Sequence, residues 1–158
     1  PYQNWLQQWS REDELKVEAA IATTHLEAFA NRPLDTLSGG QRQRAWIAMA
    51  LAQDTDILLL DAPPTYLDVA HQIEVLDLLY HLSQSAHRTI VLVLRDLNIA
   101  GRYSHHLIAL RQGQVLAQGT PAEVITESLV KQVFDLDSRI ITDPVSGTPL
   151  CIPISQFL

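Results

Sequence analysis

The stretch Leu37–Asp61, LSGGQRQRAWIAMALAQDTDILLLD, decides the fold. It joins a Ser-Gly-Gly turn to a predicted helix over Gln41–Ala52 and to an apolar run at Ile57–Leu60. A turn that opens a helix presents free backbone N–H groups at the positive end of the helix dipole. The stretch therefore predicts a phosphate-facing site. A simple Ser N-cap with a glycine turn is the alternative, and the helix and strand that follow favour the phosphate site.

Composition sets limits on the fold and on the partners. The chain has 158 residues, 47% hydrophobic and 18% charged, which suits one globular domain with a core of its own. It carries 11 basic and 18 acidic residues, a net charge of −7. Nucleic-acid affinity comes largely from phosphate neutralisation, so this balance argues against a nucleic-acid partner. The single cysteine, Cys151, is expected to be a small buried hydrophobic residue.

Helices and strands alternate over the first two thirds of the sequence. A helix is predicted from Ser10 to about Phe29, and a second, amphipathic one over His71–Ser83. The apolar runs Ile57–Leu60 and Thr89–Leu94 are typical of strands covered on both faces of a parallel sheet. This alternation predicts the α/β class with a largely parallel sheet.

The last third is predicted to hold smaller elements. Asp96–Tyr103 reads as a short helix, and Leu107–Leu110 with Gln114–Ala117 as a tight hairpin. Thr120–Glu123 combines a cap, a proline and a glutamate that start a helix. The tail over Ile140–Ile154 is expected to be extended, with one turn inside it.

Two carboxylates follow the strand that ends at Leu60. Asp61 stands where ligands bind at the carboxyl ends of parallel strands, although a strand-end Asp also serves as a turn cap. Asp68 lies in Thr65–Asp68, before the helix predicted from His71. A carboxylate there also favours the helix dipole, and both roles can hold together.

These motifs resemble those of ABC-type ATPases. LSGGQ resembles the signature, Ile57–Asp61 the Walker B strand, and Thr65–Asp68 the D-loop. The resemblance divides one incomplete domain into residues 1–36, the end of a helical subdomain; 37–120, the signature, Walker B, D-loop and switch region; and 121–158, a C-terminal helix and tail. The strings AHQIEVLDLL and DPVSGTPLCIPI are similar to the importers of ferric siderophores, haem or cobalamin.

The resemblance implies a role for each motif residue. Asp61 would hold Mg²⁺ through water, and Asp68 would lie close to a partner subunit. Five residues would contact ATP bound by the opposite subunit of a head-to-tail dimer: Leu37, Ser38, Gly39, Gly40 and Gln41.

Three departures from the family pattern bear on activity. The sequence holds no G-x-x-x-x-G-K-[ST] loop, which the family places before the signature, so the chain is expected to begin after that loop. Ala62 stands where the family has the Glu that polarises the attacking water. Arg95 stands where the family has its switch His, and a guanidinium cannot act as a neutral hydrogen-bond acceptor.

The resemblance thus implies the C-terminal portion of the ATP-binding subunit of an ABC importer, which energises uptake of an iron–siderophore complex. The chain alone is predicted to be inactive. The implied partners are a second ATP-binding subunit, transmembrane permease subunits and, indirectly, a periplasmic binding protein. The implied place is peripheral, on the cytoplasmic face of the inner membrane. Two alternatives remain: a non-catalytic interaction domain, and an ABC ATPase of DNA repair or translation, against which the net charge argues.

Overall fold

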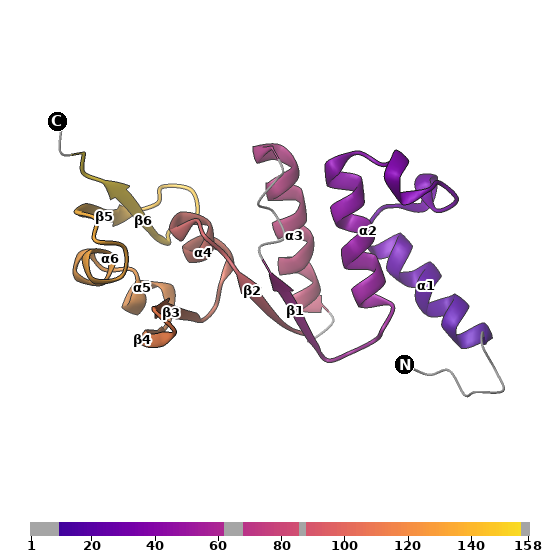
Figure 1. The fold of residues 1–158 in the computed structure, drawn as a ribbon, viewed down its shortest axis with the longest axis horizontal. Helices are drawn as coiled ribbons and strands as arrows, with labels where there is room; N and C mark the ends of the chain where they lie inside the picture. The colour runs from indigo at the N-terminus through magenta and orange to yellow at the C-terminus, as the bar shows by residue number, and fades with distance from the viewer. Residues whose placement is uncertain (1–9, 62–67, 86–87, 156–158) are drawn as a thin grey trace. The chain divides into compact units, whose positions relative to one another are not determined.

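The computed structural model describes residues 10–61, 68–85 and 88–155 (Figure 1). The chain divides into two compact units, Pro1–Val93 and Leu94–Leu158. Each unit builds its own core from its own helices and strands.

The first helix, α1, spans Arg11–Thr23 and begins as the sequence predicts. The Ser10 hydroxyl accepts from the Asp13 N–H, and the Asp13 carboxylate accepts from the Ser10 N–H, which makes a capping box. The predicted end near Phe29 is wrong. The helix stops at Thr23 because Thr24 caps it and His25 adopts a φ of +54°, which no continuing helix allows.

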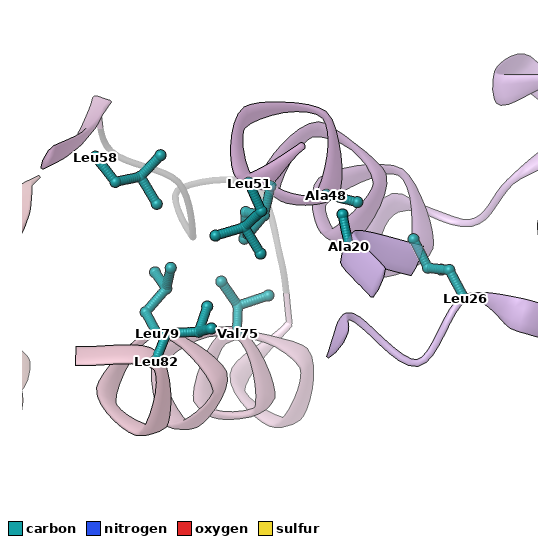
Figure 2. Packing of buried hydrophobic residues seen from close by; sticks show 9 residues of the cluster. Ala20, Leu26, Ala48, Leu51, Leu58, Val75, Leu79 and Leu82 are labelled. Carbon is teal, nitrogen blue, oxygen red and sulfur yellow. The ribbon is translucent and has the colours of Figure 1, made fainter. Parts of the chain in front are cut away.

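Two single turns of 3-10 helix, Glu27–Phe29 and Leu34–Thr36, connect α1 to α2. Helix α2 spans Gly39–Leu51 and α3 spans Val69–Ser85, close to their predicted ranges. Figure 2 shows side chains of α3 that point toward Leu51 of α2 and Leu58 of strand β1 (Ile57–Asp61). The cluster buries nine residues: Ala20, Leu26, Ile47, Ala48, Leu51, Leu58, Val75, Leu79 and Leu82. This cluster is the core of the first unit.

Strands β1 (Ile57–Asp61) and β2 (Thr89–Val93) pair in parallel, as predicted. The side chains that alternate toward the core, such as Leu58, contact the helices. The opposite face is open rather than covered as the sequence predicts, since Leu59 is 73% exposed and Val93 is 53% exposed. An apolar strand face of this kind needs a further layer of structure.

The second unit begins with helix α4 (Leu97–Tyr103), followed by the predicted hairpin of β3 (Leu107–Arg111) and β4 (Gln114–Gly119). The two strands are antiparallel. Both loop residues have positive φ, +51° at Gln112 and +78° at Gly113. Positive φ at both positions is the geometry that two-residue hairpins favour.

The rest of the second unit forms a helical corner and a second hairpin. Helix α5 spans Pro121–Val124 and α6 spans Glu127–Phe134. Strands β5 (Ser138–Thr142) and β6 (Pro149–Pro153) pair antiparallel, as the extended tail with a turn predicts. The core of this unit buries Ile125, Val130 and Cys151, so the expectation for Cys151 is confirmed.

Candidate functional site

The Ser-Gly-Gly motif forms the first turn of α2. The Ser38 hydroxyl caps the Gln41 N–H at 3.3 Å, and the Gln41 side chain accepts from the Ser38 N–H at 3.0 Å. Gly39 and Gly40 are the first two helical residues, whose N–H groups have no acceptor within a helix. The motif therefore holds two donors and a hydroxyl at the positive end of a 13-residue helix.

Arg42 braces the approach to this turn, a role that the sequence does not reveal. Its guanidinium Nη2 donates to the carbonyl oxygens of Asp35 at 3.2 Å and Leu37 at 3.3 Å. Leu37 is buried, which anchors the residue before the cap. The entry to the signature is thus held by one buried leucine and one arginine.

Asp68 caps α3 and holds His71. Its carboxylate accepts from the backbone N–H of His71 at 2.9 Å and contacts the imidazole Nδ1 at 2.8 Å. Hydrogen bonds from the His71 N–H and then from its ring hold the pKa of the Asp68 carboxyl below its usual range. The His71 ring in turn lies against Gly40 of α2. The structure thus brings the two predicted motifs together through His71, a histidine whose role the sequence does not reveal.

Asp61 is the last residue of β1 and pairs in register with Val93 of β2. Its side chain is exposed. An exposed carboxylate at the carboxyl end of a parallel strand can accept a hydrogen bond from water that is bound to a hard cation such as Mg²⁺. Ala62, the predicted position of the missing glutamate, lies outside the described residues.

Arg95 precedes α4 in the second unit, and its side chain is exposed. Asp96 caps the helix by accepting from the N–H groups of Asn98 and Ile99. The Asn98 side chain pairs with both backbone groups of Cys151 in β6, accepting at 2.7 Å and donating at 3.1 Å. The segment that carries Arg95 is thereby fastened to the C-terminal hairpin.

A second contact fastens the same helix. The Arg102 guanidinium donates to the Asp143 carboxylate at 2.6 Å, and the Val145 N–H donates to the same carboxylate. The guanidinium first, and then that N–H, hold the pKa of the Asp143 carboxyl well below its usual range. Asn98 and Arg102 are four residues apart and so share one face of the helix. The string DPVSGTPLCIPI is therefore a structural partner of α4.

The arrangement fits an anionic ligand at the start of α2. Two N–H donors that have no acceptor within α2, beside a hydroxyl, match the acceptor oxygens of a phosphate, and glycines let those oxygens approach the backbone closely. The contacts described above assign no acid or base to this turn. Its chemistry is therefore binding and charge stabilisation rather than proton transfer.

Comparison with known proteins identifies the class. The ABC transporter family model matches residues 2–65. The petrobactin import ATP-binding protein FpuD of Bacillus anthracis is 60% identical over 97% of this chain and 56% of its own length. The ferric enterobactin transport ATP-binding protein FepC of Escherichia coli is 50% identical over 99% of this chain and 58% of its own length.

The fold is also similar to that of a solved structure. The dimeric ATP-binding cassette MJ0796, in a post-hydrolysis state bound to ADP and Pi, superposes with a TM-score of 0.60 at 35% identity. The match covers 71% of this chain and 49% of that one.

The chain belongs to the ATP-binding domains of ABC transporters, as the signature motif predicts. Its relatives include ATP-binding proteins of petrobactin import and of ferric enterobactin transport. It spans about half the length of the curated relatives that it matches. Among the residues that the structure describes, no helix is long and apolar enough to cross a membrane.

Proposed function

We propose that this chain is the signature-bearing portion of an ABC importer's ATP-binding subunit, which energises uptake of an iron–siderophore complex by ATP hydrolysis. The capped Ser-Gly-Gly turn at the start of α2 is the observation that carries the proposal. The names of relatives at 60% and 50% identity supply the class of cargo.

In the proposed head-to-tail dimer, Ser38, Gly39 and Gly40 donate to the γ-phosphate of ATP held by the opposite subunit. Leu37 and Gln41 hold the turn in shape, through burial and through the capping box. Asp61 would accept hydrogen bonds from water molecules on Mg²⁺, and the bound ion would neutralise charge on the phosphates. Asp68 lies at the partner subunit. Binding of this kind closes the dimer without any proton transfer by the signature.

Ala62 and Arg95 are expected to make ATP hydrolysis slow. Ala62 offers no carboxylate to orient water, and such help contributes about 10²- to 10⁴-fold in rate. Arg95 stays charged and cannot accept a hydrogen bond as a neutral imidazole does. The expected state is a closed dimer that holds ATP for a long time.

The same proposal places the protein and its partners. Permease subunits bind the ATP-binding dimer at the cytoplasmic face of the inner membrane, and a periplasmic binding protein acts indirectly. The net charge of −7 is consistent with the absence of a nucleic-acid partner.

The test joins this chain to a P-loop-bearing N-terminal half from a close relative. Size-exclusion chromatography with Mg-ATP is expected to show a stable dimer, with little ATP turnover. The double substitution Ala62→Glu and Arg95→His introduces the residues of the family pattern and is expected to raise ATP turnover by about 10²-fold or more. An unchanged rate would show that positions 62 and 95 lack the assigned roles.

A non-catalytic interaction domain is the second candidate, favoured by Ala62 and Arg95. It predicts no ATP-dependent dimer even in the joined protein. Calorimetric titration of the 158-residue chain with Mg-ATP is expected to show no binding below the millimolar range. A micromolar dissociation constant would place a complete nucleotide site within this chain and contradict the proposal.

A further inference from the structure

Gly40 lies in the first turn of α2, buried beneath the imidazole of His71. A Cβ added at Gly40 would lie 3.0 Å from Cγ of that ring and closer still to Cδ2. Carbon atoms repel one another at such distances, so any side chain at position 40 would displace the ring. The space that a side chain would need is already occupied from within the protein.

The ring is held in that place from the other side. Its Nδ1 lies 2.8 Å and 2.9 Å from the two carboxylate oxygens of Asp68. A carboxylate accepts only, so Nδ1 carries the proton. The backbone N–H of His71 also donates to Asp68. His71 therefore stands between a carboxylate that fixes its ring and a glycine that receives it.

A neighbouring ion pair also joins α2 to α3. Arg44 lies four residues after Gly40, and Glu74 lies three residues after His71, so both pairs repeat by about one helical turn. The Arg44 Nη2 and the Glu74 Oε2 are 3.8 Å apart. Arg44 is half-buried and Glu74 is exposed, so the pair adds little stability, but it shows that α2 and α3 meet along this line.

We propose that His71 is a positioning residue that couples the D-loop carboxylate of Asp68 to the N–H donors at the start of α2. Gly40 is then a glycine because the ring of His71 occupies the place of its side chain. The inference rests on the proposed function, because those donors matter only if they bind phosphate across the dimer.

The coupling has a direct structural consequence. A displaced ring loses its hydrogen bonds to Asp68, and Asp68 then loses part of its hold on the first turn of α3. A movement of Asp68 at the partner subunit would likewise shift the surface on which Gly40 rests. The two motifs therefore respond together to closure of the dimer.

A double-mutant cycle tests this in the joined protein. We expect Gly40→Ala to raise the Mg-ATP concentration for half-maximal dimer formation by about tenfold, as for a coupling of about 1.4 kcal/mol. Adding His71→Ala is expected to reverse most of that shift, because the alanine then has room. ATP binding to the P-loop, read by a fluorescent ATP analogue before dimer formation, is expected to stay unchanged.

Two matched variants separate packing from hydrogen bonding. His71→Phe keeps a ring against Gly40 and loses the donor, so it is expected not to rescue Gly40→Ala. His71→Asn keeps an N–H donor for Asp68 in a smaller side chain, so it is expected to rescue best. Additive losses in the double variants would overturn the inference and leave close phosphate approach as the reason for Gly40.

A measurement on the 158-residue chain separates this inference from the proposed function. The amide resonance of Gly40 is expected to shift in Asp68→Asn. This substitution lies at the cap of α3, and the described contacts link it to Gly40 through His71. An unshifted resonance overturns the coupling whatever the joined protein does. A shifted resonance, with no ATP-dependent dimer in the joined protein, supports the coupling and rejects the proposed function.

Discussion

The starts of α2 and α4 are both capped, yet they are held in different ways. At α2, Ser38 and Gln41 cap each other across three residues. At α4, Asp96 provides a local cap, but Asn98 bonds Cys151 across 53 residues and Arg102 bonds Asp143 across 41. The cap of α2 is thus built from its own sequence, whereas α4 is held at both its first and its last turn by a distant hairpin.

Candidate site residues are therefore positioned in two ways, by the local sequence at α2 and by contacts with a distant segment at α4. The signature turn forms wherever its helix forms, because its cap lies within the motif. The segment that carries Arg95 depends on β5 and β6, since their backbone and turn supply the partners of α4. Changes in the C-terminal hairpin are therefore expected to act on the segment that carries Arg95.

The largest effect is expected from Asn98→Ala. This change leaves the N–H and C=O of buried Cys151 without their partner, which costs about 2–4 kcal/mol for the two groups. Native-state hydrogen exchange in the joined protein is expected to show that loss at the Cys151 amide and along α4. The matched Asn98→Asp variant keeps only the acceptor and is expected to lose less. Equal protection in all three proteins would contradict the fastening.

A smaller effect is expected on acidification. Because the folded-state pKa of Asp143 is depressed, its contribution to stability is fully present above the ordinary Asp value of about 3.9. It is lost as the pH falls below that value toward the depressed one. Arg102 is 39% exposed, so solvent screens the pair and limits the effect.

Thermal melting between pH 7 and pH 2 measures this contribution. Asp143→Asn is expected to lower the melting temperature at pH 7 and to flatten its decline in acid relative to the native chain. Asp135→Asn, which changes an exposed carboxylate of the same unit, serves as the matched control. Parallel declines in the native and Asp143→Asn proteins would contradict the assignment.

The smallest effect is expected at the local cap. Ser38→Ala removes the acceptor for the Gln41 N–H and is expected to cost about 1 kcal/mol. Ser38→Asp restores an acceptor and is expected to recover most of the loss. Hydrogen exchange at Gln41 reads the difference, and the loss should stay within the first turn of α2. A loss that spreads to α1 would show that the cap is not local.

Secondary structure is predicted correctly where the residues that cap or turn an element lie within that element or next to it. The capping box at Thr120, the glycine turn at Gly113 and the parallel pair of apolar strands all form as predicted. The end of α1 is mispredicted because no glycine or proline marks it in the sequence, and His25 takes the positive φ of +54° that ends the helix. The open face of β1 and β2 is mispredicted because an apolar run shows that cover is needed and not which segment provides it.

The family and the α/β class follow from the sequence, because the signature, the apolar strands and the caps are each encoded within a few neighbouring positions. The contacts that join Asp68 to Gly40 through His71, and α4 to the C-terminal hairpin through Asn98 and Arg102, are visible only in the folded chain. They differ from the local features because they join residues that are far apart in sequence. A hydrogen bond within one helical turn follows from local geometry, whereas a contact between distant segments depends on how the whole unit folds.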